Sequence, residues 1–116
     1  MGNSEKRIAR LVKRGRWTKI QKMLGKSDSA TRAAITTELG NTQEEDAFNI
    51  LVMLLKDNDE KVQLEAVKSL GVLGVERAKV HLQDMISKIP EDKTELNDAI
   101  KNSIAQINEA VRSEAM

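Results

Sequence analysis

The chain contains no cysteine and no tyrosine, and it has one histidine, one proline and only two aromatic residues, Trp17 and Phe48. Without cysteine there is no disulfide framework, no thiolate nucleophile and no cysteine-ligated zinc or iron–sulfur site. Such a chain suits a reducing compartment, and we expect a cytoplasmic protein. Because stacking on bases needs aromatic rings, two rings count against single-strand nucleic-acid binding.

Long apolar runs and catalytic motifs are also missing. The longest apolar run, ILVMLL at residues 50–55, is far too short to cross a bilayer, and residues 1–17 hold no stretch typical of a signal peptide. No glycine-rich nucleotide-binding motif and no paired-histidine zinc motif occurs, and His81 stands alone. We therefore expect a protein that is not an enzyme and has no cofactor, no metal site and no membrane span.

The 116 residues suffice for one hydrophobic core, and we expect a single domain over residues 1–116. Hydrophobic residues make up 40% of the chain and charged residues 32%, which is too apolar for a disordered protein. The chain is also rich in Ala, Leu, Glu and Lys, the residues that favour helix. This composition predicts a soluble, all-α fold.

Charge is spread unevenly along the chain. Residues 1–26 hold nine Lys or Arg and a single acid, Glu5, for a formal charge of +8. The other 90 residues hold 10 basic and 17 acidic side chains, for a formal charge of −7. A basic N-terminal end is therefore joined to an acidic body.

The sequence repeats with a period of 31 residues. The segment TRAAITTELG (31–40) aligns with VQLEAVKSLG (62–71), and a third copy follows after three extra residues around Pro90. Each copy carries two apolar stripes at helical spacing, and periods in this range indicate pairs of helices that stack to bury a shared core. We expect a basic helix within residues 1–16 and helix pairs at 17–40, 43–71 and 75–111, seven helices in all.

The ends of the central pair can be predicted in more detail. Its second helix should begin after Asn58 or Asp59, whose side chains are good N-caps, and the chain should leave that helix at Gly71 and Gly74. In its first helix, Phe48, Val52 and Met53 are expected to be buried beside the main stripe.

The recurring residues resemble a known family. They are Leu54, Leu55, Asp57, Asp59, Val62, Ala66, Leu70 and Gly71, with weaker copies at Asp28, Arg32, Leu39 and Gly40 and at Leu96, Ile100 and Ile104. This pattern is similar to the HEAT repeat, in the short form found in phycobilisome-lyase-like proteins, over about residues 17–110. The resemblance implies a right-handed α-solenoid of three helix pairs with an extra N-terminal helix. Gln63 and Asn97 stand where the family usually has Arg, so no continuous arginine ladder is expected.

Two candidate binding surfaces follow. The resemblance implies that the second helices line the concave side and present to a partner Arg32, Thr36, Gln63, Val67, Asn97 and Lys101. The basic end offers a second surface, made of Lys6, Arg7, Arg10, Lys13, Arg14, Arg16, Lys19 and Lys22. It would suit an acidic protein, a nucleic acid or an anionic membrane, or its charges would only solvate a cap over the stack, with Trp17 and Ile20 packed in the core.

We therefore expect a non-catalytic interaction or scaffold module that binds a protein partner through its concave surface and its basic end. One alternative is a nucleic-acid-binding protein that uses the Lys/Arg cluster. A second, implied by the resemblance, is a phycobilin-lyase-like or chaperone subunit, although the lack of cysteine and of acid–base groups counts against a lyase. Self-association through the open ends of the stack is a further alternative.

Overall fold

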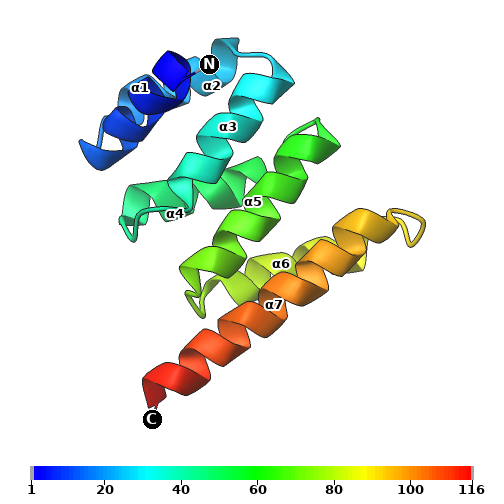
Figure 1. Ribbon diagram of the computed structural model, residues 1–116. Coiled ribbons are helices and arrows are strands. Elements are labelled where there is room, and N and C mark those ends of the chain that lie inside the picture. Colours follow the sequence, from blue (N-terminus) through cyan, green and yellow to red (C-terminus); the bar gives the residue numbers. More distant parts are fainter. Residues whose placement is uncertain (1, 116) are drawn as a thin grey trace.

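The computed structural model describes residues 2–115, which form seven helices and no strand (Figure 1). Helix α1 (Gly2–Lys13) precedes three helix pairs. The pairs are α2 (Trp17–Lys26) with α3 (Ser29–Leu39), α4 (Glu45–Leu54) with α5 (Glu60–Leu73), and α6 (Ala78–Lys88) with α7 (Thr94–Ala115). The predicted seven helices and the all-α solenoid are confirmed. The last two pairs run further than expected, to Leu73 and Ala115.

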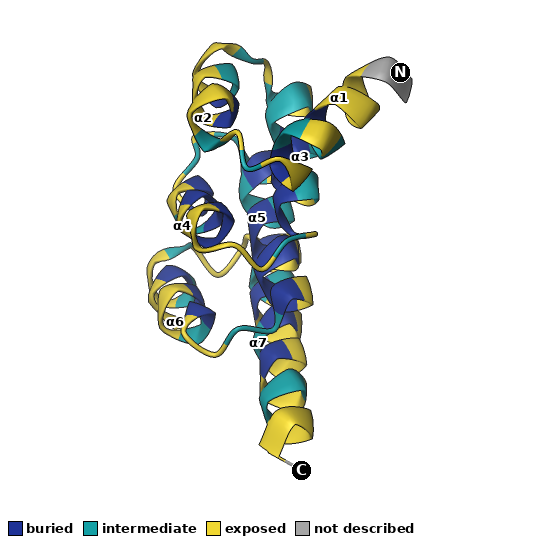
Figure 2. Ribbon diagram, turned by 90° about the vertical axis from the view of Figure 1, so that its left-hand side faces the viewer, coloured by how far each residue is buried: buried dark blue, intermediate teal, exposed yellow. Residues whose placement is uncertain are grey.

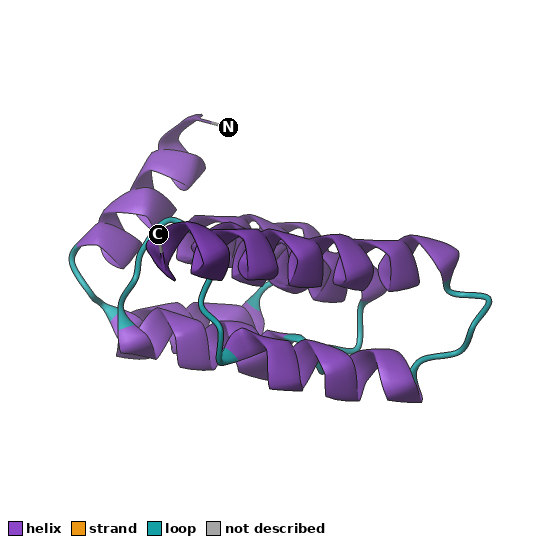
Figure 3. Cartoon of the chain, turned by 90° about the horizontal axis from the view of Figure 1, so that it is seen from below, coloured by secondary structure: helices purple, strands orange, loops and turns teal. Residues whose placement is uncertain are grey.

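The helix pairs stack in two layers. Helices α2, α4 and α6 form one layer and α3, α5 and α7 the other (Figure 2), and the view from below shows the two layers edge-on (Figure 3). Within the second layer α5 lies between α3 and α7 and contacts both, while α1 packs on α2 and α3 at the N-terminal end. Each pair therefore covers the apolar face of its neighbours, which makes stability a matter of nearest-neighbour contacts.

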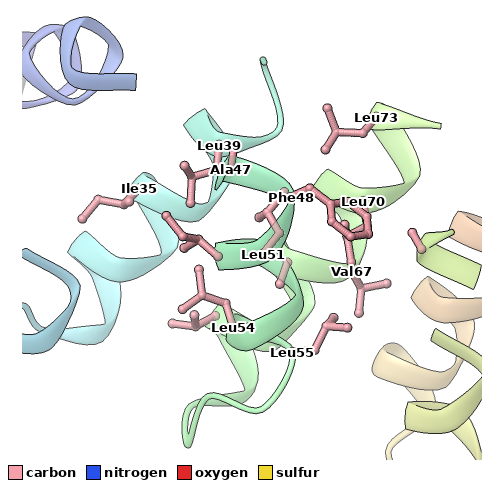
Figure 4. Close-up of a cluster of buried hydrophobic side chains, with 14 of the residues drawn as sticks. Ile35, Leu39, Ala47, Phe48, Leu51, Leu54, Leu55, Val67, Leu70 and Leu73 are labelled. Carbon is pink, nitrogen blue, oxygen red and sulfur yellow. The ribbon is translucent and has the colours of Figure 1, made fainter. Parts of the chain in front are cut away.

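The core runs between the two layers along the whole stack (Figure 2). Around α4, Phe48 and Leu51 reach toward Leu39 of α3 and Leu70 of α5 (Figure 4). One helix pair alone cannot remove its apolar stripe from water, so the pairs stack and bury these residues between them. Met53, in contrast, is 55% exposed, so the prediction that it is buried was wrong.

Helix ends follow the expected capping chemistry. Asp28 accepts a hydrogen bond from the backbone N–H of Thr31 at 2.8 Å, and this bond lowers the pKa of the Asp28 carboxyl. Asp59 caps α5 in the same way, accepting from Lys61 at 2.9 Å. The helix then ends at Gly74, whose φ of +66° suits glycine because it has no Cβ.

Gly71 does not end α5, so that prediction was wrong. It lies inside the helix, and a Cβ built on it would come within 2.9 Å of the Ser103 Cβ and 2.5 Å of the Gln106 Oε1. Real Cβ atoms do not approach other atoms so closely, so only glycine lets α7 pack at this distance. Gly71 therefore permits the close contact between α5 and α7, which belong to successive repeats.

Candidate functional site

Two of the side chains predicted to meet a partner on the second helices are buried instead. Thr36 and Val67 are both 0% exposed. Their backbone carbonyl oxygens accept hydrogen bonds from the hydroxyls of Ser69 and Ser103, at 3.0 and 2.8 Å, because each sits where the next second helix packs. The prediction that Thr36 and Val67 face a partner was wrong.

Arg32, also predicted to face a partner, is tied into the scaffold. Its Nε and Nη2 each lie 3.2 Å from an oxygen of Asp57, and Nη1 donates to the backbone oxygen of Ser27 at 2.8 Å. The pair is largely buried, with side chains 18% and 12% exposed. Because Arg32 belongs to the first helix pair and Asp57 to the second, the ion pair links two repeats.

At the equivalent positions of the next pairs, amides replace this arginine. Gln63 donates to the backbone oxygen of Leu55 at 3.0 Å, and Asn97 donates to that of Pro90 at 3.0 Å. Both bonds stay within one helix pair. The ion-pair link of Arg32 is therefore not repeated at these two positions.

The exposed row of the second helices lies one residue further along than predicted. Thr37, Lys68 and Asn102 are exposed, and Lys101 is exposed as well. One residue turns a side chain by about 100° around the axis of a helix with 3.6 residues per turn. Lys68 and Asn102 border a shallow cavity of about 260 Å³ between α5 and α7, together with Leu64. The repeat period defines equivalent positions, but it does not define which side of each helix is covered.

Six of the eight predicted basic residues surround one hollow, which we call the basic groove. It has a volume of about 870 Å³ and lies between α1 and the start of α2. The cations that line it are Arg7, Arg10, Arg14, Arg16, Lys19 and Lys22. Lys6 and Lys13 are exposed on α1 but do not line the groove.

The amphipathic pattern of α1 explains how this groove forms. Ile8 and Val12 are buried against the stack, 4% and 5% exposed, so the charged side chains of the helix remain in water. At Gly15 the backbone takes a φ of +68° and turns, which brings α2 back alongside α1. Leu11 and Trp17 are half-buried and give the groove an apolar part of its lining.

The charge of the basic groove is not compensated within the part of the chain that the structure describes. None of its six cations forms an ion pair there, and no acidic residue lines the groove. The three remaining arginines, Arg32, Arg77 and Arg112, each pair with a carboxylate. Concentrated, unpaired positive charge raises the local concentration of anions.

Metal-ligand clusters, membrane-spanning helices and the surroundings of His81 also bear on the kind of site that residues 2–115 could form. No group of three or more metal-ligating side chains occurs in that range, and no helix in it is long and apolar enough to cross a membrane. The ring of His81 lies edge-on to Phe48, with 6.3 Å between ring centroids. Arg77 covers the same phenyl ring at 4.1 Å from its centroid. His81 itself is exposed, and its ring contact with Phe48 is made at the surface.

Comparison with known proteins identifies the family. The sequence profile of the HEAT repeats matches residues 18–101, well over half of the chain. The chain therefore belongs to the HEAT-repeat family, whose members commonly act as protein-interaction scaffolds. The match is to HEAT repeats in general and does not single out the phycobilisome-lyase-like form. Neither the comparison with curated proteins nor that with solved structures found a match.

Proposed function

We propose that this chain is a non-catalytic interaction module that binds an acidic segment of another protein in the basic groove. One observation carries the proposal: six cations line one groove that has no acid in its lining, and none of them has an ion-pair partner among the described residues. Six like charges in one groove repel one another, and an anionic ligand removes that repulsion. Membership of the HEAT-repeat family supports a protein as the ligand.

Binding would rest on charge and shape presented by a semi-rigid scaffold. The cations would attract the acidic segment from a distance and orient it, which acts mainly on the rate and specificity of association. Leu11 and Trp17 would then contact an apolar side chain of the segment. Ile8 and Val12 hold α1 on the stack, so little ordering of the groove would be needed on binding.

The exposed second-helix face is a further contact surface in this proposal. Gln63 and Asn97 are half-buried and Lys101 is exposed, so all three remain within reach of a partner. Lys68 and Asn102, at the cavity between α5 and α7, join them.

Nucleic acid is the second candidate, because the same six cations could contact phosphates. Two features favour protein. The chain beyond residue 26 carries a formal charge of −7, which repels a long polyanion, and only Trp17 and Phe48 could stack on bases. Phe48 is buried, which leaves Trp17 alone for that role.

Trp17 provides a direct readout, since it is the only tryptophan, no tyrosine is present, and it lines the groove. An acidic peptide with one leucine, and a single-stranded RNA of equal charge, are titrated while tryptophan fluorescence is recorded. We expect the peptide to bind more tightly than the RNA, and its affinity to fall between about 50 and about 200 mM salt.

Two double variants with the same change in net charge test whether the peptide binds in the basic groove. Arg10→Glu with Arg14→Glu reverses two charges in the groove and should abolish peptide binding. Lys56→Glu with Lys61→Glu makes the same change in net charge at exposed sites outside the groove and should leave the affinity nearly unchanged. Equal losses in both variants would contradict the proposal, as would tighter binding of the RNA.

A further inference from the structure

Resting on the proposed function, we infer that the basic groove recognises a phosphorylated serine or threonine within the acidic segment. Binding of the partner is then switched on by phosphorylation of the partner. The cavity, the kinds of cation around it and the backbone at its edge support this inference separately.

The lining of the basic groove is richer in arginine than in lysine. It holds four of the seven arginines of the chain but only two of its twelve lysines. The guanidinium group is a planar fork of donors that binds two oxygens of one phosphate at once, whereas an ammonium group acts as a point charge. A lining built only to solvate a terminal cap has no need of this preference.

The arginines of the groove come from two segments of the chain, one before and one after the turn at Gly15. Arg7 and Arg10 lie one turn apart on α1, and Arg14 follows in the turn directly after the last residue of that helix, Lys13. Arg16 also lines the groove and stands immediately before α2. A compact dianion in the groove can therefore meet guanidinium groups from both segments, while single carboxylates spread the same charge over separate positions. This favours phosphate, which carries about −1.5 to −2 charges on three oxygens.

The start of α2 adds donors to the same place. Arg16 occupies the N-cap position and provides no side-chain hydrogen bond, and the first turn contains no acidic residue. The first backbone N–H groups of a helix have no acceptor within the helix, and here Trp17 and Thr18 line the groove. The positive end of the helix dipole thus adds to the positive charge of the six cations. The inference rests on those cations in the first place.

The limited size of the groove favours one phosphorylated side chain over a nucleic acid. Its volume of about 870 Å³ suits a few residues of a bound segment. A nucleic acid carries many phosphates in a row and would extend past the groove to the acidic body, whose formal charge is −7. A phosphoserine places its charge at one point and leaves the remainder of the segment free to avoid the body.

Three peptides of otherwise identical acidic sequence test the inference. The first peptide has a serine at the central position and the second a phosphoserine. In the third, two glutamates replace that serine, so its charge matches that of the phosphopeptide. Titration followed by Trp17 fluorescence should give the phosphopeptide an affinity about tenfold above that of the glutamate peptide, the factor that one charge-assisted hydrogen bond provides. The serine peptide should bind more weakly than both.

Conservative variants separate hydrogen-bond geometry from charge. Arg10→Lys with Arg14→Lys keeps every charge in the groove but removes two forks, so it should erase the preference for phosphoserine while binding of the glutamate peptide persists. Arg112→Lys changes an arginine outside the groove and should leave the preference intact.

The outcomes separate the two proposals. Equal affinity of the phosphoserine and glutamate peptides would show that the groove reads charge alone, which overturns the inference and leaves the proposed function standing. Failure of all three peptides would overturn both. Tighter binding of a single-stranded RNA than of the phosphopeptide would overturn the inference in favour of nucleic acid.

Discussion

The hydroxyl of Ser69 on α5 donates a hydrogen bond to the backbone carbonyl oxygen of Thr36 on α3, 3.0 Å away. One repeat later, Ser103 on α7 makes the same bond to Val67 on α5, at 2.8 Å. All four residues are buried, so each bond satisfies polar atoms that water cannot reach. The second helices are thus joined by one contact used twice, which fixes how each repeat sits on the next.

Replacing Gly71 by alanine tests this close approach. The new Cβ would lie 2.9 Å from the Ser103 Cβ, and crowding of this kind destabilises a core by about 1–3 kcal/mol. The better helix propensity of alanine offsets up to about 1 kcal/mol of that loss. We expect a net fall in the free energy of unfolding, measured by urea denaturation.

Gly25→Ala is the matched control, because a Cβ on this α2 glycine has nothing within 4 Å. It should leave stability unchanged or raise it by up to about 1 kcal/mol. If Gly71→Ala proved as stable as Gly25→Ala, α5 and α7 would have to lie further apart at Gly71 than the Cβ distances indicate.

The Arg32–Asp57 ion pair should contribute more than an exposed one. Arg32→Ala leaves a largely buried carboxylate without its partner and should lower the free energy of unfolding by about 2 kcal/mol. Arg112→Ala breaks a pair whose side chains are both 66% exposed, and it should change stability by about 0–0.5 kcal/mol. A double-mutant cycle with Asp57→Asn measures the coupling, and a value near zero would contradict the role assigned to Arg32.

Asp28 should make part of the stability depend on acid pH. The hydrogen bond from Thr31 holds its pKa below the ordinary value of 3.8, so the charged form is favoured in the folded state. Its contribution is complete above pH 3.8 and is lost as the pH falls through 3.8 and then through the lower folded-state pKa.

Asp28→Asn keeps a capping oxygen but cannot titrate. Urea titrations of both proteins across this range should show the wild type losing stability relative to the variant as the solution is acidified. A difference that stays constant with pH would mean that the Asp28 carboxylate is not held by the helix.

Much of the fold could be predicted because burial of apolar stripes dominates it. The 31-residue period and the stripes through Val62, Ala66 and Leu70 predicted the helix pairs, and these residues are fully buried. Gly71 was misassigned because a glycine that permits close packing and a glycine that ends a helix look alike in sequence. Only the neighbouring helix, 30 or more residues away, distinguishes them.

The candidate site could be predicted less fully. Net charge identified the basic end, but whether a cation is free depends on distant residues. Arg32 finds its carboxylate 25 residues away, while Arg10 and Arg14 pair with none of the described residues. The second-helix face was misplaced by one residue at Thr36 and Val67, because sequence spacing does not reveal the angle at which helices pack.

The central claim is that the basic groove, and not the second-helix face, is the primary binding surface. It is tested most directly by following the backbone amide signals of the whole protein by NMR while an acidic peptide is added. We expect the largest shifts at Gly15, Trp17 and Lys19 and smaller ones at Lys68 and Asn102. Shifts centred on Lys68 and Asn102, with residues 7–22 unmoved, would contradict the claim and place the partner on the second helices.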